Sequence, residues 1–217
     1  MRIVAISDTH GYHKRLTIPE GDMLICAGDF SMRAKSYEVT QFAEWFNQQP
    51  HKYKVIVPGN HDVACEGDRP WCKEEFSPAV YLDHEESKVA GYRVFGSPYS
   101  SSIYEPSPWA FDYPPNGDRS ERLWSQIPDG IDILITHGPP KGILDVVLDP
   151  HVGEDQHVGD VNLLYHVKRV IPKVHIFGHI HEGYGKYISP VWTTEFYNVC
   201  VCDVHYQPRN PVTVIDL

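Results

Sequence analysis

The sequence contains no long apolar run. None of its 217 residues lies in a stretch apolar enough over about 20 positions to span a bilayer, so no membrane contact is expected. The first residues enter a strand pattern at once, without the apolar segment and cleavage site of a signal peptide. Internal repeats, low-complexity tracts and domain boundaries are also missing, and we expect a single domain over residues 1–217.

Cysteine is sparse and odd in number. The spacing of the five cysteines is not that of a disulfide framework, which favours a reducing, cytoplasmic location. Two of them form a Cys-x-Cys pair that would lie on one face of a strand. Because there is no second pair, this predicts a structural strand rather than a zinc site. The five are Cys26, Cys65, Cys72, Cys200 and Cys202.

Basic residues are in the minority. Lys and Arg number 19 against 29 Asp and Glu, which gives a net charge of −10. A surface that binds extended nucleic acid needs a basic footprint, so such a partner is not expected. A small phosphorylated substrate remains compatible with this charge if metal ions supply the local positive charge. The 41% of hydrophobic residues is ordinary for a globular chain of this length.

The most informative stretch is a turn at residues 58–62. It follows the apolar run Val55–Val57 and begins with Pro-Gly, which predicts a buried strand that ends in a sharp turn. Asn60 offers a neutral oxygen ligand, and His61 offers a proton near neutral pH. Asp62 offers a carboxylate that could orient a neighbouring imidazole. The turn therefore predicts a ligand, an acid and an orienting group in succession.

Apolar periodicity predicts alternating strands and helices, typical of an α/β fold. Helical spacing occurs at residues 37–47, 71–76, 119–126 and 161–170. Strands are predicted at residues 3–6, 23–27, 55–57, 79–81, 92–95, 131–135, 174–177, 196–201 and 212–215. Two long loops are predicted, at residues 96–117 and 141–159.

Five of these strands are followed directly by side chains that bind metals. In α/β sheets, sites form at the carboxyl ends of the strands, so we expect the five ends to converge. Two pairs have one residue between them, and on an extended chain such pairs share a side. The side chains are Asp8 and His10, then Asp29, then Asn60 with His61 and Asp62, then His137, and finally His179 and His181.

The order of these motifs resembles the calcineurin-like metallophosphoesterases. Its elements are Asp-x-His, Gly-Asp, Gly-Asn-His-Asp, His and Gly-His-x-His, over residues 8–181. The stretch 136–145 and the tail near Asn210-Pro211 are similar to a smaller branch, the metallophosphoesterase-domain proteins related to class III cyclic-nucleotide phosphodiesterases. The resemblance implies an α/β fold of two mixed sheets packed as a sandwich and flanked by helices.

The resemblance also implies a binuclear metal site bridged by Asp29. His61 would face the phosphoester and Asp62 would support it. Phe30-Ser31-Met32 after Gly28-Asp29 departs from the family pattern and puts no ligand in doubt. One ion would be bound by Asp8, His10, Asp29 and His181. The other would be bound by Asp29, Asn60, His137 and His179.

A ligand set of nitrogen and oxygen atoms without a thiolate suits Mn, Fe, Zn or Ni, and it does not identify which of these metals is bound. Two such divalent ions can activate a water and stabilise both the attacking and the leaving oxygen of a phosphoester. His61 would then protonate the leaving oxygen. We therefore predict a metal-dependent phosphoesterase that acts on a phosphodiester, such as a cyclic or small nucleotide.

Two other functions stay open. One is a nuclease acting on DNA or RNA, against which the net charge counts. The other is a non-catalytic scaffold that keeps this fold to bind a protein partner, against which the complete ligand set counts.

The loop at residues 96–117 is rich in proline and aromatic residues. Its aromatic side chains could form a wall on which a nucleobase stacks. Burial of the loop against the core is the simpler explanation and is the one that we predict. The residues concerned are Tyr99, Tyr104, Trp109, Phe111 and Tyr113.

Overall fold

Two mixed β-sheets stack face to face in the computed structural model, which describes residues 1–102, 107–148 and 155–217. The first sheet has the strand order β15-β1-β2-β3-β4. Strands β1 to β4 are parallel, and β15 pairs antiparallel with β1. The strands are β1 (Arg2–Ile6), β2 (Met23–Ala27), β3 (Tyr53–Val57), β4 (Val80–Tyr81) and β15 (Thr213–Asp216).

The second sheet has six strands in the order β13-β14-β12-β9-β6-β5. Its four central strands are parallel, and an antiparallel strand closes each edge. Both sheets are therefore mixed, as predicted. The strands are β5 (Glu85–Val89), β6 (Tyr92–Ser97), β9 (Ile133–Thr136), β12 (Val174–Phe177), β13 (Gly185–Ile188) and β14 (Glu195–Asn198).

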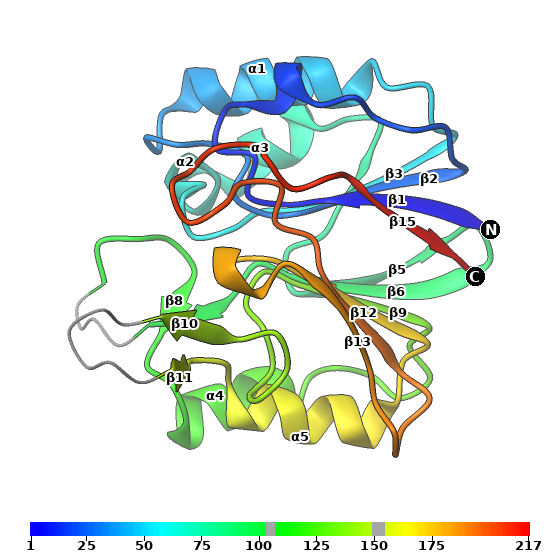
Figure 1. Ribbon diagram of the computed structural model, residues 1–217. Coiled ribbons are helices and arrows are strands. Elements are labelled where there is room, and N and C mark those ends of the chain that lie inside the picture. Colours follow the sequence, from blue (N-terminus) through cyan, green and yellow to red (C-terminus); the bar gives the residue numbers. More distant parts are fainter. Residues whose placement is uncertain (103–106, 149–154) are drawn as a thin grey trace.

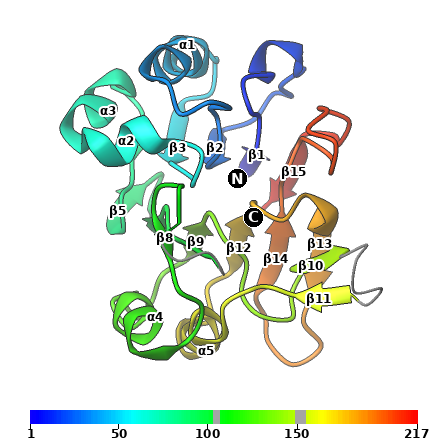
Figure 2. The ribbon, with the colours of Figure 1, turned by 90° about the vertical axis from the view of Figure 1, so that its left-hand side faces the viewer.

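Helices cover the outer face of each sheet (Figures 1 and 2). Helices α1 (Ser36–Asn47), α2 (Val63–Gly67) and α3 (Arg69–Glu75) lie over the first sheet, and α4 (Gly117–Trp124) and α5 (Val161–Val170) lie over the second. Two 3-10 turns are η1 (His13–Arg15) and η2 (His181–Gly183). The predicted sandwich with flanking helices is confirmed.

Alternation along the strands builds three apolar layers. In β1, Ile3 and Ala5 pack between the two sheets, where they meet Val94 and Ile133 of the second sheet. Val4 points the other way and packs under the helices of the first sheet. Because both faces of the parallel strands are covered, these strands are apolar along most of their length. The layers hold the strands rigidly, so their carboxyl ends form a fixed platform.

Several short strands were not predicted. The edge strand β5 has the sequence Glu-Glu-Ser-Lys-Val and is largely exposed, so it lacks an apolar alternation. The predicted loop at 96–117 contains β7 (Ser100–Ser101) and β8 (Asp112–Tyr113), and the predicted loop at 141–159 contains β10 (Val146–Leu148) and β11 (Asp155–His157). Each of these four strands has only two or three residues, which is too short for an apolar alternation to be recognised in the sequence.

The cysteine prediction was wrong for one pair. Cys65 of α2 and Cys72 of α3 form a disulfide, while Cys26, Cys200 and Cys202 are free and buried. The two short helices bring the pair together, with a Cα–Cα distance of 5.2 Å. The cysteine content therefore no longer supports a reducing compartment. Among the described residues, no helix is both long and apolar enough to cross a bilayer.

Candidate metal centre

The carboxyl ends of parallel strands from both sheets meet at one end of the sandwich (Figure 2). Strands β1, β2 and β3 contribute from the first sheet, and β9 and β12 contribute from the second. Backbone hydrogen bonds join the ends to one another, such as Asp8 N to the Gly28 oxygen and Gly178 N to the His137 oxygen, both at 2.9 Å. The structure brings together all seven predicted ligands, which are Asp8, His10, Asp29, Asn60, His137, His179 and His181.

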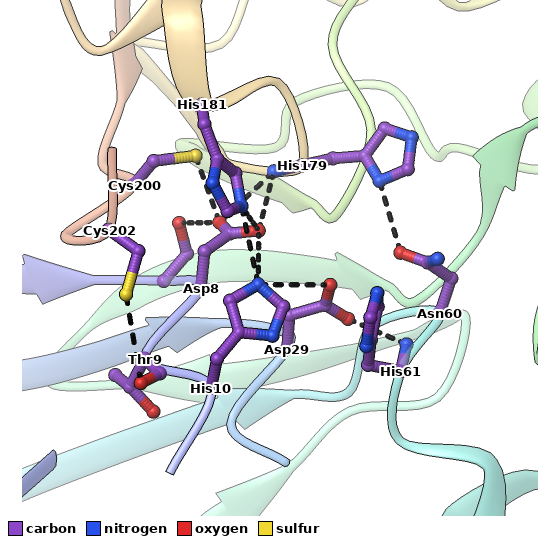
Figure 3. A network of polar contacts seen from close by, with 12 residues as sticks. Asp8, Thr9, His10, Asp29, Asn60, His61, His179, His181, Cys200 and Cys202 are labelled. Atoms are coloured by element: carbon purple, nitrogen blue, oxygen red, sulfur yellow. Dashed lines mark hydrogen bonds and ion pairs between the residues drawn. The ribbon is translucent and has the colours of Figure 1, made fainter. Parts of the chain in front are cut away.

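One cluster of ligand atoms surrounds Nε2 of His10 (Figure 3). This nitrogen lies 3.2 Å from Nε2 of His181 and 3.8 Å from Oδ2 of Asp29. Nε2 of His181 in turn lies 3.5 Å from Oδ1 of Asp8. Asp8, His10 and His181 each offer one ligand atom within 4.8 Å of the others, and His10 and Asp29 do the same together with His61.

The second cluster surrounds Oδ1 of Asn60. Nε2 of His137 lies 2.9 Å from this oxygen and Nδ1 of His179 lies 3.0 Å from it. Nε2 of His137 is also 3.3 Å from Oδ1 of Asp29. Asp29 thus presents Oδ2 to the first cluster and Oδ1 to the second, which is the arrangement of a bridging carboxylate.

The tautomers in the first cluster fit a bound cation. Nδ1 of His10 donates to the Ser31 carbonyl oxygen, and Nδ1 of His181 donates to the Asp203 carbonyl oxygen at 2.8 Å. Because a carbonyl oxygen can only accept, each neutral ring keeps its lone pair on Nε2. Two lone pairs then face each other over 3.2 Å, beside carboxylates. A positive charge is needed between them.

The second cluster has the same property. Nδ1 of His137 donates to the Ala27 carbonyl oxygen at 2.9 Å, so the lone pair of the neutral ring is on Nε2. That lone pair faces the oxygens of Asn60 and Asp29, and all three groups are acceptors. The donor set of both clusters, imidazole with carboxylate and amide oxygens, fits a divalent transition metal.

The pKa values of the histidines in the two clusters reflect the negative charge of the neighbouring carboxylates. Burial opposes a charge on His137, but the carboxylates of Asp29 and Asp8 outweigh it and raise the pKa of His137 to about 10. Burial is likewise outweighed at His181, where the hydrogen bond and the charge of Asp8 raise the pKa to about 9. Burial prevails at His10 and lowers its pKa to about 4. The raised pKa values of His137 and His181 show that the carboxylates favour positive charge in both clusters.

The backbone of the ligands is strained. Asp8, His10, Asp29 and His179 have φ angles of 52°, 41°, 56° and 69°, in the left-handed region that non-glycine residues rarely adopt. Such strain costs about 1–3 kcal/mol per residue and is concentrated at functional sites. Gly59 is required by close approach, because a Cβ there would lie 2.3 Å from Oδ1 of Asp29.

Asp62 has a different role from the predicted one. Its Oδ2 accepts from the backbone N–H groups of Asp29 and Gly59, and its Oδ1 accepts from the N–H and hydroxyl of Ser31, all within 2.9 Å. The Asp62 carboxylate therefore joins the turn that carries Asp29 to the turn that carries Asn60, and both of its oxygens are used as acceptors in doing so. Burial and the charge of Asp29 raise the pKa of Asp62 to about 7 against these donors.

The His61 imidazole is oriented by a backbone carbonyl instead. Nδ1 of His61 donates to the Met32 carbonyl oxygen at 3.2 Å, so the lone pair of the neutral ring is on Nε2. The His61 N–H donates to Oδ1 of Asp29 at 2.8 Å, so the backbone of His61 is fixed by a ligand of both clusters. Ser31 and Met32, which depart from the family pattern, therefore each hold one of these side chains. Ser31 donates to Asp62, and the Met32 carbonyl oxygen accepts from His61.

A family model described as calcineurin-like phosphoesterase matches residues 1–183, which include all the predicted ligands. The chain belongs to this family. Metallophosphoesterase domain-containing protein 1 of Homo sapiens is 39% identical over 240 residues, which cover 100% of this chain and 71% of the relative. A UPF0046 protein of Caenorhabditis elegans is 31% identical over a match that covers 100% of this chain and 60% of the length of that protein. The solved structure of TT1561 from Thermus thermophilus shares the fold, with a TM-score of 0.62 at 14% identity over 91% of this chain and 88% of that one.

This calcineurin-like phosphoesterase also uses a cysteine that the sequence did not reveal as part of the site. The thiol of Cys200 donates to Oδ2 of Asp8 at 3.0 Å, and the Ser7 hydroxyl donates to the same oxygen. The backbone N–H of His179 donates to both Asp8 oxygens. Asp8 is thus held by three groups, and its Oδ1 faces His181 (Figure 3). The Cys-x-Cys alternation was the only signal for this contact.

The aromatic loop of the phosphoesterase divides into two parts. Phe111 and Tyr113 are buried, and Tyr99 packs against the core, so the predicted burial is confirmed for these three. Trp109 differs, because it is 39% exposed and stacks on His61. Tyr104 lies outside the described residues.

Proposed function

We propose that this protein hydrolyses a phosphodiester, such as a cyclic or small nucleotide, with the help of two divalent metal ions. The observation that carries the proposal is the geometry of Asp29, whose two oxygens face separate sets of ligand atoms. In each set, neutral imidazole rings would direct their Nε2 lone pairs toward the facing ligand atoms. This is the arrangement that two neighbouring cations require, and binuclear sites of this kind are used for phosphoester hydrolysis.

The residues that would hold the ions fall into the two clusters. Asp8, His10, His181 and Oδ2 of Asp29 form one set. Oδ1 of Asp29, Asn60, His137 and His179 form the other. When bound, Mn, Fe, Zn or Ni ions would offset the charge of the phosphate and make a water more acidic.

His61 supplies the acid in this proposal. Its Nδ1–H is committed to the Met32 carbonyl, so Nε2 is the atom that can hold a second proton and give it to the leaving oxygen. His61 is about nine-tenths buried and directly follows Asn60 in the chain, so in this proposal it would lie beside a phosphate held at the second cluster. Because Nε2 is not needed as a ligand in this proposal, the side chain is free for proton transfer.

The choice of a diester rests on two points. The stretch at residues 136–145 resembles the branch related to class III cyclic-nucleotide phosphodiesterases. In addition, a net charge of −10 disfavours a dianionic monoester more than a monoanionic diester. The same charge disfavours the nuclease alternative, because long nucleic acids meet a larger part of the acidic surface.

The proposal is tested with a metal-loaded screen. The purified protein is loaded separately with Mn, Fe, Zn and Ni, and its metal content is measured by elemental analysis. Bis-p-nitrophenyl phosphate, p-nitrophenyl phosphate, cyclic nucleotides and linear dinucleotides are then compared by kcat/KM. We expect diesters to be hydrolysed faster than monoesters.

The alternatives have distinct outcomes. Protein that carries two ions and hydrolyses none of these esters would refute the enzyme and favour the scaffold that binds a protein partner. Binding of long DNA or RNA with a steep salt dependence would favour the nuclease.

A further inference from the structure

Trp109 lies directly on the imidazole that the proposed function uses as the acid. Its ring is stacked on His61 with a centroid distance of 4.1 Å and an interplanar angle of 20°. The neighbouring Ala110 and Phe111 are each 1% exposed, whereas Trp109 is 39% exposed. The chain is therefore buried directly after Trp109, while the indole itself, with one face on His61, keeps part of its surface open to what approaches that site.

The position of Trp109 is fixed by the turn that carries the ligand Asn60. The N–H of Ala110 donates to the Asn60 carbonyl oxygen at 3.0 Å. The N–H of Phe111 donates to Oε1 of Glu66 at 3.1 Å, and Glu66 lies in α2 directly after the turn. The N–H of Trp109 itself donates to the Ser107 hydroxyl at 3.2 Å. Because these bonds fix the backbone, the indole is a built part of the site.

A second exposed ring lies on the ligand side of His61. Tyr206 is 40% exposed, and its ring centroid lies 4.7 Å from that of His10 and 4.9 Å from that of His181. Its distance from the His61 ring is 6.3 Å, longer than that of Trp109. Tyr206 therefore borders the first cluster of metal ligands, while Trp109 borders the acid.

The acid determines where the leaving group lies. A side chain that protonates the leaving oxygen must be within hydrogen-bond distance of it. The group attached to that oxygen then lies beside His61, on whose ring the exposed indole of Trp109 is stacked.

We propose that Trp109 is the specificity-determining residue for the leaving group and that it selects a flat, unsaturated one, of the aryl or heteroaryl class, which stacks on the indole. This rests on the proposed function, because it takes His61 as the acid. A neutral aromatic platform suits such a group, since stacked rings gain more than their buried area alone gives. A saturated chain of similar size can pack on the indole but lacks the additional gain from ring stacking.

The experiment compares two methyl phosphodiesters with leaving alcohols of matched acidity. One alcohol is a phenol and the other is a fluorinated aliphatic alcohol. In the variant Trp109→Ala we expect kcat/KM for the aryl ester to fall about tenfold, mainly through KM, and that for the aliphatic ester to change less than about twofold. Trp109→Phe should keep the aryl preference, and Tyr165→Ala, an exposed aromatic residue on α5, should match the wild type.

Binding without turnover gives an independent measurement. Phenylphosphonate and methylphosphonate are titrated by calorimetry into the metal-loaded wild type and into Trp109→Ala. We expect only phenylphosphonate to lose affinity in the variant, by about tenfold.

Equal losses for the aryl and aliphatic ligands would overturn the proposal and leave Trp109 a support for the His61 ring. If the wild type itself hydrolysed neither ester, the proposed function would fail first. Denaturant unfolding of each variant identifies any that is not folded, and Trp109→Phe then decides the question.

Discussion

The amide oxygen of Asn60 lies 2.9 Å from Nε2 of His137, so that two acceptors face each other in a buried site. Nδ1 of His137 is already used as a donor to Ala27. The contact is stable only if a proton or a metal ion lies on the shared axis. The first prediction follows from this relationship and from its counterpart between His10 and His181.

The two clusters should lose their ions separately. We expect about two ions per chain in the wild type and about one in His181→Ala or in His179→Ala, because each of these histidines belongs to one cluster. Asp29→Ala should retain neither ion firmly, since its two oxygens serve both clusters. Elemental analysis after dialysis measures the content, with the exposed Lys88→Ala as the control. Equal losses in all three variants would contradict two separate clusters.

The effect of His61→Ala should depend on the leaving group. An alkoxide needs a proton on departure, while p-nitrophenolate does not. We therefore expect kcat to fall by about 100-fold to 10,000-fold for an alkyl ester, and much less for a p-nitrophenyl ester. Steady-state kinetics on the two esters checks this, and metal content should stay unchanged. An equal loss on both esters would remove His61 as the acid.

Asp62→Asn should affect folding as well as activity. Its carboxylate accepts from Asp29, Gly59 and Ser31, and an amide would place an N–H against one of these donors. We expect a loss of about 3 kcal/mol in the free energy of unfolding, since buried donors are left without partners. Denaturant titration measures it. Asp216→Asn, in an exposed ion pair with Arg2 that solvent screens, should have a much smaller effect on the free energy of unfolding. An unfolding free energy equal to that of the wild type, with kcat alone reduced, would restore the predicted orienting role.

The convergence of the candidate ligands could be predicted because each of them follows a strand closely in the sequence. Strand ends converge by topology, so position and residue type together located Asp8, His137 and the others without knowledge of the packing. The role of Asp62 could not be predicted in the same way. Its partners at Asp29 and Ser31 lie about thirty residues away, and apart from the Ser31 hydroxyl they are backbone N–H groups that leave no trace in residue types.

The contacts of single side chains could not be predicted from the sequence either. Trp109 and Phe111 are two residues apart in one aromatic loop, and only packing decides that the first covers His61 while the second is buried. The disulfide between Cys65 and Cys72 depends on the angle between two helices of five and seven residues. Neither the angle between short helices nor the exposure of one ring is encoded in periodicity.

Acid should destabilise the fold through a buried histidine that is not among the candidate ligands. His175 of β12 is fully buried, its Nε2 is 2.8 Å from the Thr136 hydroxyl, and its Nδ1 has no hydrogen-bond partner among the described residues. Burial lowers the pKa of His175 from 6.5 to about 3. Below pH 6.5 the unfolded chain therefore binds a proton that the folded chain does not, and the free energy of unfolding falls as the pH falls. This loss continues until the pH reaches the folded pKa.

At one pH unit below 6.5 the loss from this residue alone should be about 1.4 kcal/mol. His175→Gln removes the titration and keeps an N–H that can donate to Thr136. Whatever its absolute stability, the variant should therefore lose about 1.4 kcal/mol less than the wild type between pH 7.5 and pH 5.5. Urea titrations of the metal-free proteins at the two pH values measure this difference, and metal-free protein is needed because protonation of the metal ligands would add its own pH dependence. Parallel pH profiles for the two proteins would show that His175 is charged, or accessible to protons, in the folded state.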